Sequence, residues 1–599
     1  MKIERKMMVI GLSCLLVSIA VGSAYAVTRT IQSNKETISG GTYFYSGNYD
    51  WITGSHFNLS SKITNSKGHV WNATGANIKL AIYDLGNTTG GKVWIPPGTF
   101  YFTSTIYLTN KTSIIGAGQE STVLKAGTGY ASTVGLLSKY PGNNITIKDM
   151  TINMNDTNSG FYFSRTRNIT IQNVCVRDIV GNGFYFSNNC TGIIMSDVRI
   201  YNVSDIQGIG IRWSNDSVFN NIVFINGSGT ANCAIDASTG CKNLTFNNIV
   251  IKDYQRGIKT TYNNGTMFNN IFIENAVGTY GMDIQYAHHC TVNNIMVRGS
   301  SFSISGSDHV NVNNLDSYNS ATYGLVISTS SRFVNVNNAI IRYSTNQPLS
   351  IGTSNNFTLN NVQVLNPTTY SYITTCKDFR LSNCNFMSSA SYGIDLVGNN
   401  QFMITGCIFE LNTNYAIITS LGAPNHNYTI SDCIFRSNSN GIYMADDTNV
   451  TITGCRFLKN TNAAIHMETT TRNVVVTNCV MTNNMNGFEL SATRNLLVSN
   501  CIIDRSTGSG VYTVACHNYS FVNCQVLNGA GIGFNLGADS NLTISCCRIY
   551  GNSGDGIECD ALDSVFIVNC IMWGQNFDDN IVGSHNMTGS AYNIGMTII

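Results

Sequence analysis

Apolar and polar residues alternate in short segments that recur along most of the chain about every 23 residues. In one such segment Val450, Ile452 and Phe457 take the apolar positions, and Thr451 and Thr453 take polar positions. Alternation of this kind predicts a β-strand with one buried face, and a second strand follows later in each unit. A unit this short does not fit a two-helix repeat, so the pattern predicts an all-β, single-stranded parallel β-helix with two or three strands per coil. We expect a right-handed coil, because crossovers between parallel strands are nearly always right-handed.

One position in each unit marks the coils. Cysteine occupies it, at intervals of 22 to 26 residues, in nine consecutive units: Cys384, Cys407, Cys433, Cys455, Cys479, Cys501, Cys524, Cys547 and Cys570. Upstream it is another residue, almost always apolar: Met150, Val174, Val198, Ile222, Ile249, Ile271, Ile295, Leu315, Ala339 and Val362. These 19 positions predict one solenoid of about 19 coils. Stacked side chains keep their Cβ atoms about 4.8 Å apart, too far for a disulfide, so we expect buried free thiols.

The residue before this marker position is also patterned. It is Asn, Asp or Gly in nearly every unit: Asn173, Asn221, Asn248, Asn270, Asn294, Asn314, Asn338, Asn361, Asn383, Asn478, Asn500, Asn523, Asn569, Asp149, Asp197, Asp432, Gly406 and Gly454, with Cys546 as the exception. These residue types tolerate a left-handed backbone, so the position predicts a tight bend between two strands. Stacked amides at such a bend can hydrogen-bond from coil to coil.

The N-terminus carries the features of an export signal. Lys2, Arg5 and Lys6 precede an apolar stretch over 7–21, and Ala-Tyr-Ala at 24–26 provides a cleavage site. The apolar stretch is short for a membrane span. We therefore expect a secreted or cell-surface protein that has no membrane contact after cleavage of the signal.

Composition narrows the range of partners. Charged residues make up 11% of the chain and the net charge is +1, whereas nucleic acids and anionic membranes bind basic surfaces. Both are therefore disfavoured as partners. The nineteen Asn-x-Ser/Thr sequons predict a glycoprotein only in a host that glycosylates exported proteins.

A short helix is predicted before the first coils. Ile78, Leu80, Ala81, Ile82 and Leu85 lie at approximately helical spacing, and a glycine follows them. A helix at this place would cover the open edge of the first coil. The chain accordingly divides into a signal peptide (1–26), an accessory segment (27–70), a capping helix with the first coils (71–126), the β-helix repeats (127–575) and a C-terminal cap or tail (576–599).

The segment around this helix carries a family resemblance. Residues 90–102 read Gly-Gly-Lys-Val-Trp-Ile-Pro-Pro-Gly-Thr-Phe-Tyr-Phe, and residues 113–118 read Ser-Ile-Ile-Gly-Ala-Gly. This resembles the opening of the pectate-lyase-like superfamily, in the group called pectate lyase 3 or rhamnogalacturonase/epimerase-like. The resemblance implies a parallel β-helix with a helical cap and activity on polysaccharides. The family's Gly-Asp-Gly-x-Thr-Asp-Asp segment is absent, and Asn-Ala-Thr-Gly-Ala at 72–76 takes its place.

One group of polar residues is a candidate catalytic site. When the second strands of successive coils are aligned, neighbouring coils carry Arg212, Asp236, Lys259, Asp283 and Gln285, with His288 and His289 just beyond. β-Elimination at a uronate needs a basic residue to take the proton, and Ca²⁺ or a second basic residue to neutralise the carboxylate. The first four residues are therefore candidate catalytic residues, and Gln285 is a candidate substrate ligand. A solvated ladder of ion pairs is the alternative interpretation. The motifs of polygalacturonase-type hydrolases are not found.

A second group is a candidate glycan-binding surface. It comprises Tyr443, His466, Glu489, Tyr512, Asn535 and Glu558, flanked by Glu468 and Asp560. Tyrosine faces alternating with hydrogen-bonding groups suit an extended glycan. Carboxylates two coils apart, at about 9.6 Å, also lie near the upper limit for an inverting acid and base. No metal site is predicted, and Ca²⁺ at the turn pairs Asp446–Asp447 or Asp578–Asp579 is the cofactor that stays open.

Two classes of function stay open. The first is an exported lyase or glycosidase whose partner is an extracellular polysaccharide or cell-surface glycan. The second is a non-catalytic surface or matrix glycoprotein or adhesin. A third interpretation is a tailspike-like homotrimeric fibre, in which outward apolar residues such as Val326, Ile373 and Ile418 are buried between the three copies.

Overall fold

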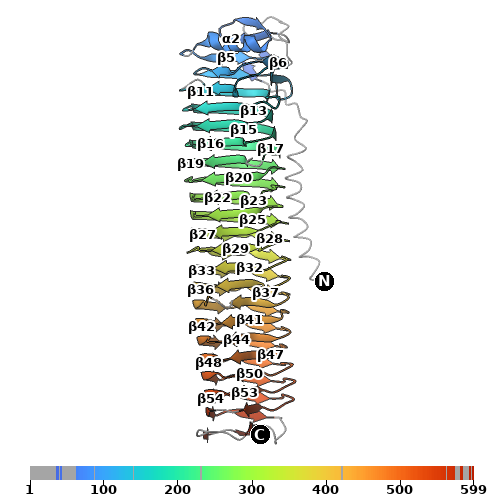
Figure 1. The fold of residues 1–599 in the computed structure, drawn as a ribbon, viewed down its shortest axis with the longest axis vertical. Coiled ribbons are helices and arrows are strands. Elements are labelled where there is room, and N and C mark those ends of the chain that lie inside the picture. The colour runs from blue at the N-terminus through green and yellow to red at the C-terminus, as the bar shows by residue number, and fades with distance from the viewer. Residues whose placement is uncertain are drawn as a thin grey trace.

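The computed structural model describes residues 36–38, 41–43, 62–86, 88–138, 141–229, 233–278, 280–419, 423–560, 563–573, 581–584, 592–594 and 597–598. The signal predicted for residues 1–26 lies outside them, as do most of the accessory segment and of the C-terminal tail. The described coils form an elongated stack (Figure 1). Among these residues no helix has the length and apolarity that a membrane span needs.

One face of the stack, called face 1, is a parallel sheet with one strand from each coil. Its strands are β7 (Ile106–Leu108), β10 (Val134–Ser138), β12 (Ser159–Ser164), β14 (Phe184–Ser187), β16 (Gln207–Arg212), β18 (Cys233–Ser238), β20 (Arg256–Thr261), β22 (Tyr280–Gln285), β24 (Ser301–Ser305), β26 (Leu325–Ser328), β29 (Leu349–Gly352), β32 (Ser371–Thr374), β35 (Ile394–Val397), β38 (Tyr415–Thr419), β41 (Asn440–Ala445), β44 (Ala463–Glu468), β47 (Asn486–Ser491), β50 (Val511–Val514), β53 (Phe534–Gly537), β56 (Ile557–Asp560) and β59 (Ile581–Ser584). Within the described residues this sheet has 21 strands. The sequence predicted about 19 coils, because the first and last coils do not carry the marker position.

The other two faces are formed by the rest of each coil. In the N-terminal half the strands are β5 (Gly91–Trp94), β6 (Gly98–Phe102), β8 (Thr112–Ile115) and β9 (Thr122–Ala126), followed by long strands that bend from one face to the next: β11 (Asn143–Asn153), β13 (Arg167–Ile179), β15 (Thr191–Val203), β17 (Asn215–Gly227), β19 (Lys242–Lys252), β21 (Met267–Glu274), β23 (His288–Arg298) and β25 (Asp308–Tyr318).

In later coils each long strand is replaced by two short ones. They are β27 (Arg332–Asn337), β28 (Ile340–Arg342), β30 (Thr358–Asn360), β31 (Gln363–Leu365), β33 (Lys377–Ser382), β34 (Asn385–Met387), β36 (Asn400–Thr405), β37 (Ile408–Glu410), β39 (His426–Ser431), β40 (Ile434–Arg436), β42 (Thr448–Thr453), β43 (Arg456–Leu458), β45 (Arg472–Thr477), β46 (Val480–Thr482), β48 (Arg494–Ser499), β49 (Ile502–Asp504), β51 (His517–Val522), β52 (Gln525–Leu527), β54 (Ser540–Ser545), β55 (Arg548–Tyr550), β57 (Asp563–Val568), β58 (Ile571–Trp573), β60 (Tyr592–Ile594) and β61 (Thr597–Ile598). The prediction of a right-handed parallel β-helix with up to three strands per coil is confirmed.

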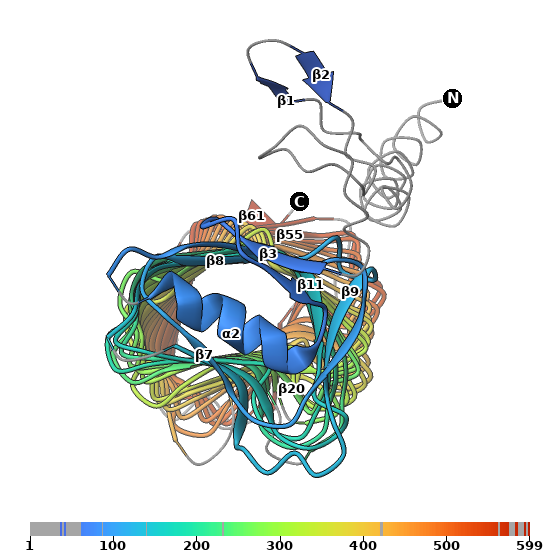
Figure 2. The ribbon, with the colours of Figure 1, turned by 90° about the horizontal axis from the view of Figure 1, so that it is seen from above.

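The N-terminal end is closed by the predicted helix, α2 (Gly75–Leu85). Thr74 caps its start by accepting a hydrogen bond from the Asn77 N–H, and Gly86, at φ 75°, ends it. Ile78, Ala81, Ile82 and Leu85 are buried, but Leu80 is 52% exposed, so its assignment to the apolar face was wrong. Figure 2 shows α2 lying across the end of the stack. Beside it lie the antiparallel strands β3 (Lys62–Asn65) and β4 (Val70–Asn72), and farther upstream β1 (Glu36–Ile38) pairs with β2 (Gly41–Tyr43).

The predicted bends between strands are confirmed. The Asn, Asp and Gly residues before the marker positions, and Cys546, all have φ between 51° and 65°. Their side chains also bond along the stack, because Asn248 Nδ2 donates to Asn221 Oδ1 at 3.0 Å and Asn270 Nδ2 donates to Asn248 Oδ1 at 3.0 Å. Such a bond on successive coils fixes the register of the bend.

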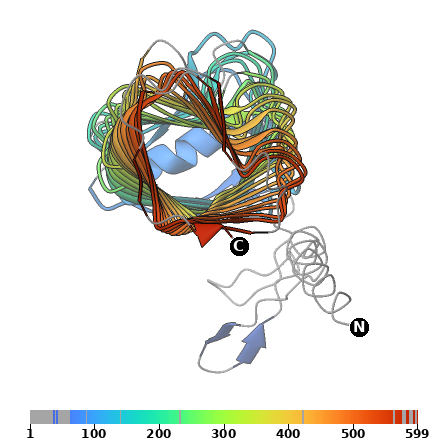
Figure 3. The ribbon, with the colours of Figure 1, turned by 90° about the horizontal axis from the view of Figure 1, so that it is seen from below.

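The interior is filled by side chains that stack on their counterparts in the next coil. Phe379 packs between Phe357 and Phe402 with ring centroids 4.8 and 4.7 Å apart, and Tyr428 stacks on Phe402 at 4.5 Å. Viewed from below, successive coils superimpose along the axis (Figure 3). Parallel coils in register place like residues in contact, which explains the regular period of the sequence.

The cysteine ladder predicts a thiol count that can be measured. All eighteen cysteines of the described residues are free, and all but Cys546 are buried. Burial raises the pKa of the Cys290 thiol to about 12, which further slows its reaction because the thiolate is the reactive form. For protein without residues 1–26, which contain Cys14, we expect rapid reaction at a single cysteine in the native state without reductant, and reaction at all eighteen after denaturation. A count near zero after denaturation, measured with a chromogenic thiol reagent, would contradict this packing.

A buried polar ladder runs through the interior beside the apolar one. Asn399 Nδ2 donates to Asn425 Oδ1 at 3.0 Å, and the Asn425 N–H donates to Asp447 Oδ1 at 2.8 Å. The Tyr428 hydroxyl donates to the other oxygen of Asp447 at 2.7 Å. Asp446, at φ 62°, turns the chain so that Asp447 faces inward. This pair therefore does not form the calcium-binding turn that the sequence left open, and the pair at 578–579 lies outside the described residues.

Asp447 makes stability depend on pH. Burial raises the pKa of its carboxyl, so the folded state holds the proton more tightly than the unfolded state, and stability falls as pH rises from about 4 toward the folded-state pKa. Replacing Asp447 by Asn is expected to remove this loss. Asp446→Asn is the matched control, because the Thr470 hydrogen bond lowers the pKa of Asp446 and reverses the sign. Urea unfolding at several pH values checks both slopes, and equal slopes in wild type and Asp447→Asn would contradict the assignment.

Candidate functional site

Residues of both candidate groups lie in one continuous column on the outside of face 1. In the register of the sheet, Asp236 lies opposite Lys259 on the next strand, and Lys259 lies opposite Asp283 on the strand after it. The same register continues without interruption to Tyr443 and Glu558. The face-1 column comprises Gly210, Asp236, Lys259, Asp283, Ser303, Val326, Ser350, Tyr372, Asp395, Ile418, Tyr443, His466, Glu489, Tyr512, Asn535 and Glu558.

Arg212 and Gln285 do not belong to this column, in contrast to the alignment expected from the sequence. Arg212 pairs with Ser238, two residues further along the strand, and Thr261 pairs with Gln285 in that second column. Two residues is the period of a strand, so both columns face outward. The guanidinium of Arg212 still reaches across, and its Nη2 lies 2.7 Å from Asp236 Oδ2.

Asp236 is buried although it lies on the outside of a strand. Its relative exposure is 6%, and besides Arg212 it accepts hydrogen bonds from Gln207 Nε2 at 2.8 Å and from the Ser238 hydroxyl. A buried carboxylate is costly unless it is paired and hydrogen-bonded. Asp236 meets both conditions, so its charge is neutralised locally.

Asp283 has a different environment. It is 5% exposed, and Gln285 Nε2 donates to its Oδ2 at 2.7 Å, but its buried Oδ1 has no hydrogen-bond partner in the described part of the chain. Burial raises the pKa of Asp283, and a hydrogen bond with Ser303, followed by the charges of Lys259 and Arg256, opposes this rise. A carboxyl in such surroundings is suited to donate a proton.

Lys259 lies between these two acids in the column. Its side chain is half-buried, and within the residues that the structure describes it makes no ion pair. His288 and His289 lie beyond the corner, in β23, where His288 Nδ1 is 3.7 Å from Asp308 Oδ2 and His289 packs on His309. They are therefore not part of the column. Lys259, together with the exposed Arg256 at the start of the same strand, is therefore a basic group of this segment that is available to a ligand.

The second segment of the column is a connected group of polar side chains. Glu468 accepts a hydrogen bond from the Tyr443 hydroxyl at 2.7 Å, and its other oxygen lies 2.9 Å from His466 Nε2. On the other side of the imidazole, Nδ1 lies 4.0 Å from Glu489 Oε2. Both of these atoms are buried and without a hydrogen-bond partner among the described residues. One hydroxyl group placed beside that gap could bond to both atoms.

Aromatic rings lead toward this group from earlier coils. Tyr370, Tyr392, Tyr415 and Tyr443 are neighbours with ring centroids 5.2, 5.7 and 4.9 Å apart. Beyond Glu489 the column continues with Tyr512, which is 37% exposed. The sequence predicted the column residues but not the three tyrosines at 370, 392 and 415. Their spacing of 22 and 23 residues is the signal that could have identified them.

The rest of the column is less polar. Asn535 and Glu558 are half-buried on the last coils, and the side chain of Asp560 lies outside the described residues. Val326 and Ile418 do lie in the column, as expected for outward apolar residues. Ile373, by contrast, is fully buried in the core, where it lies opposite Ile351. Its outward assignment was wrong, because the neighbouring residue Tyr372 takes the outward position.

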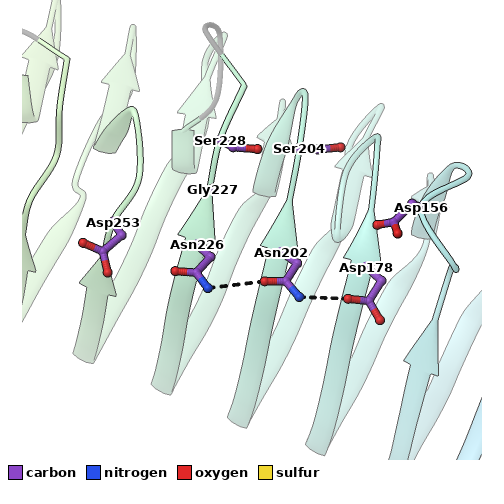
Figure 4. Close-up of a pocket in the computed structure, with 8 residues that line it drawn as sticks. All are labelled: Asp156, Asp178, Asn202, Ser204, Asn226, Gly227, Ser228 and Asp253. Atoms are coloured by element: carbon purple, nitrogen blue, oxygen red, sulfur yellow. Dashed lines mark hydrogen bonds between the residues drawn. The ribbon is translucent and has the colours of Figure 1, made fainter.

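A pocket at another corner was not predicted from the sequence. It has a volume of about 450 Å³ and is lined by Asp156, Asp178, Asn202, Ser204, Asn226, Gly227, Ser228 and Asp253. Figure 4 shows the Asn226, Asn202 and Asp178 side chains hydrogen-bonded in a row along its wall. Nowhere in the described residues do three or more His, Cys, Asp or Glu side chains gather as a metal site. The hydrogen bonds of this row are of the same kind as those between amides at the other bends. The regular stacking of the coils is therefore sufficient to explain the row.

Comparison with known proteins identifies the fold family. A family model described as right handed beta helix region matches residues 300–457 and 440–597, and one described as rhamnogalacturonase A/epimerase, pectate lyase-like, matches residues 67–283. No curated protein matches the chain significantly.

Several solved structures resemble the chain at low identity. The N-terminal fragment of gene product 12 of bacteriophage Phi29 is 12% identical, with a TM-score of 0.47 over 84% of this chain and 88% of that one. A PL6 family alginate lyase is 9% identical, with a TM-score of 0.36 over 88% and 99%. A mannuronan C-5 epimerase A-module from Azotobacter vinelandii is 15% identical, with a TM-score of 0.24 over 64% and 91%. Likeness at this level carries no information about activity. On its sequence motifs and family matches, the chain belongs to the pectate-lyase-like superfamily of right-handed parallel β-helix proteins.

Proposed function

We propose that this protein is exported and binds an extended polysaccharide along the face-1 column. The observation that carries the proposal is the pair of buried atoms His466 Nδ1 and Glu489 Oε2, which lie 4.0 Å apart without partners in the described chain. A buried polar group without a hydrogen bond costs about 1–3 kcal/mol. Both atoms are covered by their neighbours. A sugar hydroxyl both donates and accepts, so a single hydroxyl that enters when the covering side chains move aside satisfies the two atoms at once.

The surroundings of that gap also support a sugar ligand. Tyr443 and Tyr512 lie one coil to either side of the His466–Glu489 pair, and aromatic faces with a few placed polar groups are typical of sites for amphipathic ligands. Glu468 and Glu489 place negative charge at this segment, so it favours a neutral sugar over a uronate.

Tyr512→Ala is expected to weaken glycan binding by about 1–3 kcal/mol, as for the loss of an aromatic anchor. Tyr443 is a poorer choice for truncation, because its hydroxyl is bonded to Glu468. The ligand is first found by screening the wild-type protein on a glycan array, and isothermal titration calorimetry then gives the affinity of each variant. Tyr101→Ala, at a 61% exposed tyrosine of the first coils, is the matched control. Equal losses in both variants would contradict a site on the column.

Cleavage is a second candidate function, favoured by the segment from Asp236 to Asp283. Lys259 is free to take a proton or to hold a uronate carboxylate, and Asp283, whose pKa burial raises, is suited to protonate the leaving oxygen. Asp236 already accepts hydrogen bonds from Arg212, Gln207 and Ser238, so its carboxylate is not free to position a hydrolytic water. The segment therefore supports β-elimination more than hydrolysis.

A panel of acidic and neutral polysaccharides tests both functions. Elimination produces unsaturated uronates that absorb in the ultraviolet, whereas hydrolysis releases reducing sugar without that absorbance. Binding without either product leaves the protein as a glycan-binding surface protein or adhesin. If no glycan binds and no product forms, the proposal fails and a structural rod or trimeric fibre takes its place.

A further inference from the structure

A row of basic residues runs along the rod at the start of the strands that follow face 1. In the register of these strands, one position carries a basic residue on every second coil: His288, Arg332, Lys377, His426, Arg472 and His517. The coils between them carry at the same position Asp308, Asn355, Asn400, Thr448 and Arg494. We call these eleven residues the basic edge.

The composition of the chain does not account for this row. Charged residues make up 11% of the sequence, yet the eleven residues of the basic edge include four Arg or Lys, three His, one Asp and no apolar residue. All four Arg and Lys side chains are exposed. The strand requires only a polar residue at this outward position, and Asn and Thr already meet that need on the coils between. The regular basic residues therefore call for another explanation than the fold.

The C-terminal part of the basic edge stacks like charges on one another. Arg472 lies opposite Arg494 on the next coil, and Arg494 lies opposite His517. Neither arginine side chain makes an ion pair or hydrogen bond within the part of the chain that the structure describes. Like charges directly opposite each other destabilise a sheet. An anion that lies over the edge would remove this cost, so the arrangement favours an anionic ligand.

The acids near the other end of the basic edge leave its charges accessible. Arg332 Nε lies 3.9 Å from Asp308 Oδ1, and Lys377 Nζ lies 3.9 Å from Asp378 Oδ2. Both distances are too long for a hydrogen bond, and exposed pairs of this kind contribute little to stability. The hydrogen-bond donors of Arg332 and Lys377 are therefore available to a ligand as well.

We propose that the basic edge binds an acidic polysaccharide that runs along the rod, at a site separate from the face-1 column. Basic residues on every second coil lie about 9.6 Å apart, close to the length of two sugar units in an extended chain. This spacing fits a polymer with a carboxylate or sulfate on every second sugar, because Arg and Lys bind such anions by charge-assisted hydrogen bonds. Asn and Thr on the coils between donate to and accept from hydroxyl groups, and so suit the uncharged sugars.

Other polyanions fit the basic edge less well. Duplex DNA carries a charge about every 3.4 Å along each strand, which is far denser than the basic residues of the edge. Single strands stack their bases on aromatic side chains, and the edge has no Phe, Tyr or Trp. Binding in a membrane interface buries an apolar face, and the edge has no apolar residue. A polysaccharide with widely spaced charges is therefore the ligand that the edge favours.

The test removes two charges from the basic edge and two from elsewhere on the rod. Hyaluronan supplies a carboxylate on every second sugar, and keratan sulfate supplies sulfate without a uronate. We expect wild-type protein to bind at least one of them in biolayer interferometry, with an affinity that falls as salt screens the charges. Arg472→Gln combined with Arg494→Gln is expected to bind about tenfold more weakly, because two exposed ionic contacts are lost. It should unfold at the wild-type urea concentration or above it, because like charges are removed.

The matched control is Arg456→Gln combined with Lys459→Gln. Both residues are exposed and lie outside the basic edge, so this variant has the same net charge as the edge variant and should bind like wild type. If the two variants lose affinity equally, or if wild-type protein binds neither polymer, the inference is wrong. It is also wrong if duplex DNA or phosphatidylserine vesicles bind the edge arginines more tightly than both polymers do.

Tyr512→Ala separates this site from the proposed function. If Tyr512→Ala weakens hyaluronan binding and the edge variant does not, the polymer lies on the face-1 column, and the basic edge is overturned while the proposed function stands. If the edge variant alone weakens hyaluronan binding and no glycan depends on Tyr512, the basic edge stands and the proposed function fails.

Discussion

Arg212→Ala is expected to lower the free energy of unfolding by about 3–5 kcal/mol, because it leaves the charge of a buried carboxylate without its partner. Asp236 is 6% exposed, and Arg212 Nη2 lies 2.7 Å from its Oδ2. The same guanidinium also donates to the Asp236 carbonyl oxygen at 3.0 Å. Urea unfolding followed by circular dichroism measures the effect.

Two comparisons define the cause of this loss. Arg436→Ala removes an arginine that pairs with Glu410 at 2.6 Å but is 49% exposed, and exposed pairs contribute only about 0–1 kcal/mol. The double variant Arg212→Ala with Asp236→Ala removes both charges, so its loss is expected to be smaller than the sum of the single losses. If Arg212→Ala and Arg436→Ala were equally mild, Asp236 would not be the buried charge that this structure describes.

If the proposed cleavage occurs, Lys259→Ala is expected to reduce its rate by about 10²- to 10⁴-fold, the usual contribution of a positioned proton-transfer group. Its stability should stay close to that of wild type, because Lys259 is half-buried and makes no ion pair in the described part of the chain. The formation of unsaturated uronate, followed by ultraviolet absorbance, is the measurement. Lys242→Ala, at an exposed lysine of β19, is the control.

The Arg212 and Lys259 variants together distinguish a loss of catalysis from a loss of structure. We expect Arg212→Ala to lose activity because the segment is destabilised, and Lys259→Ala to lose activity while the fold stays intact. Asp283→Asn adds a third test, because Asn cannot protonate a leaving oxygen. If Lys259→Ala cleaves as fast as wild type, the segment is not a catalytic site, and its charges are a structural ladder.

The sequence predicted the coil well because each of its signals is local. Alternation of apolar residues decides which side of a strand is buried, and Asn, Asp or Gly at a bend decides where the strand turns. Both signals repeat with the coil, so they also align one coil with the next. Asp236, Lys259 and Asp283 were placed on neighbouring coils by this alignment, and the observed register agrees.

The errors share a physical origin. Ile373 and Leu80 were placed on the wrong side because one shifted residue reverses the facing of a strand or moves a helix position out of the buried stripe. Asp447 was taken as a turn residue, although the left-handed backbone of Asp446 turns it inward. A bend can turn the next side chain from the outside to the inside of the coil, and the alternation of apolar and polar residues alone does not locate such a bend.

The sequence by itself determined the fold, the coil period and many of the residues on the outside of face 1, because repetition makes these features redundant. Only the tertiary structure decided which of those residues meet. Long side chains cross between columns, so Arg212 joins Asp236 and Glu468 joins His466 although neither pair shares a column. It also decided that the outward acids Asp236, Asp283 and Asp395 are buried, and that Trp213, Tyr262 and Tyr286 line one corner. Such contacts depend on side-chain reach and on neighbouring coils, which a one-dimensional pattern does not contain.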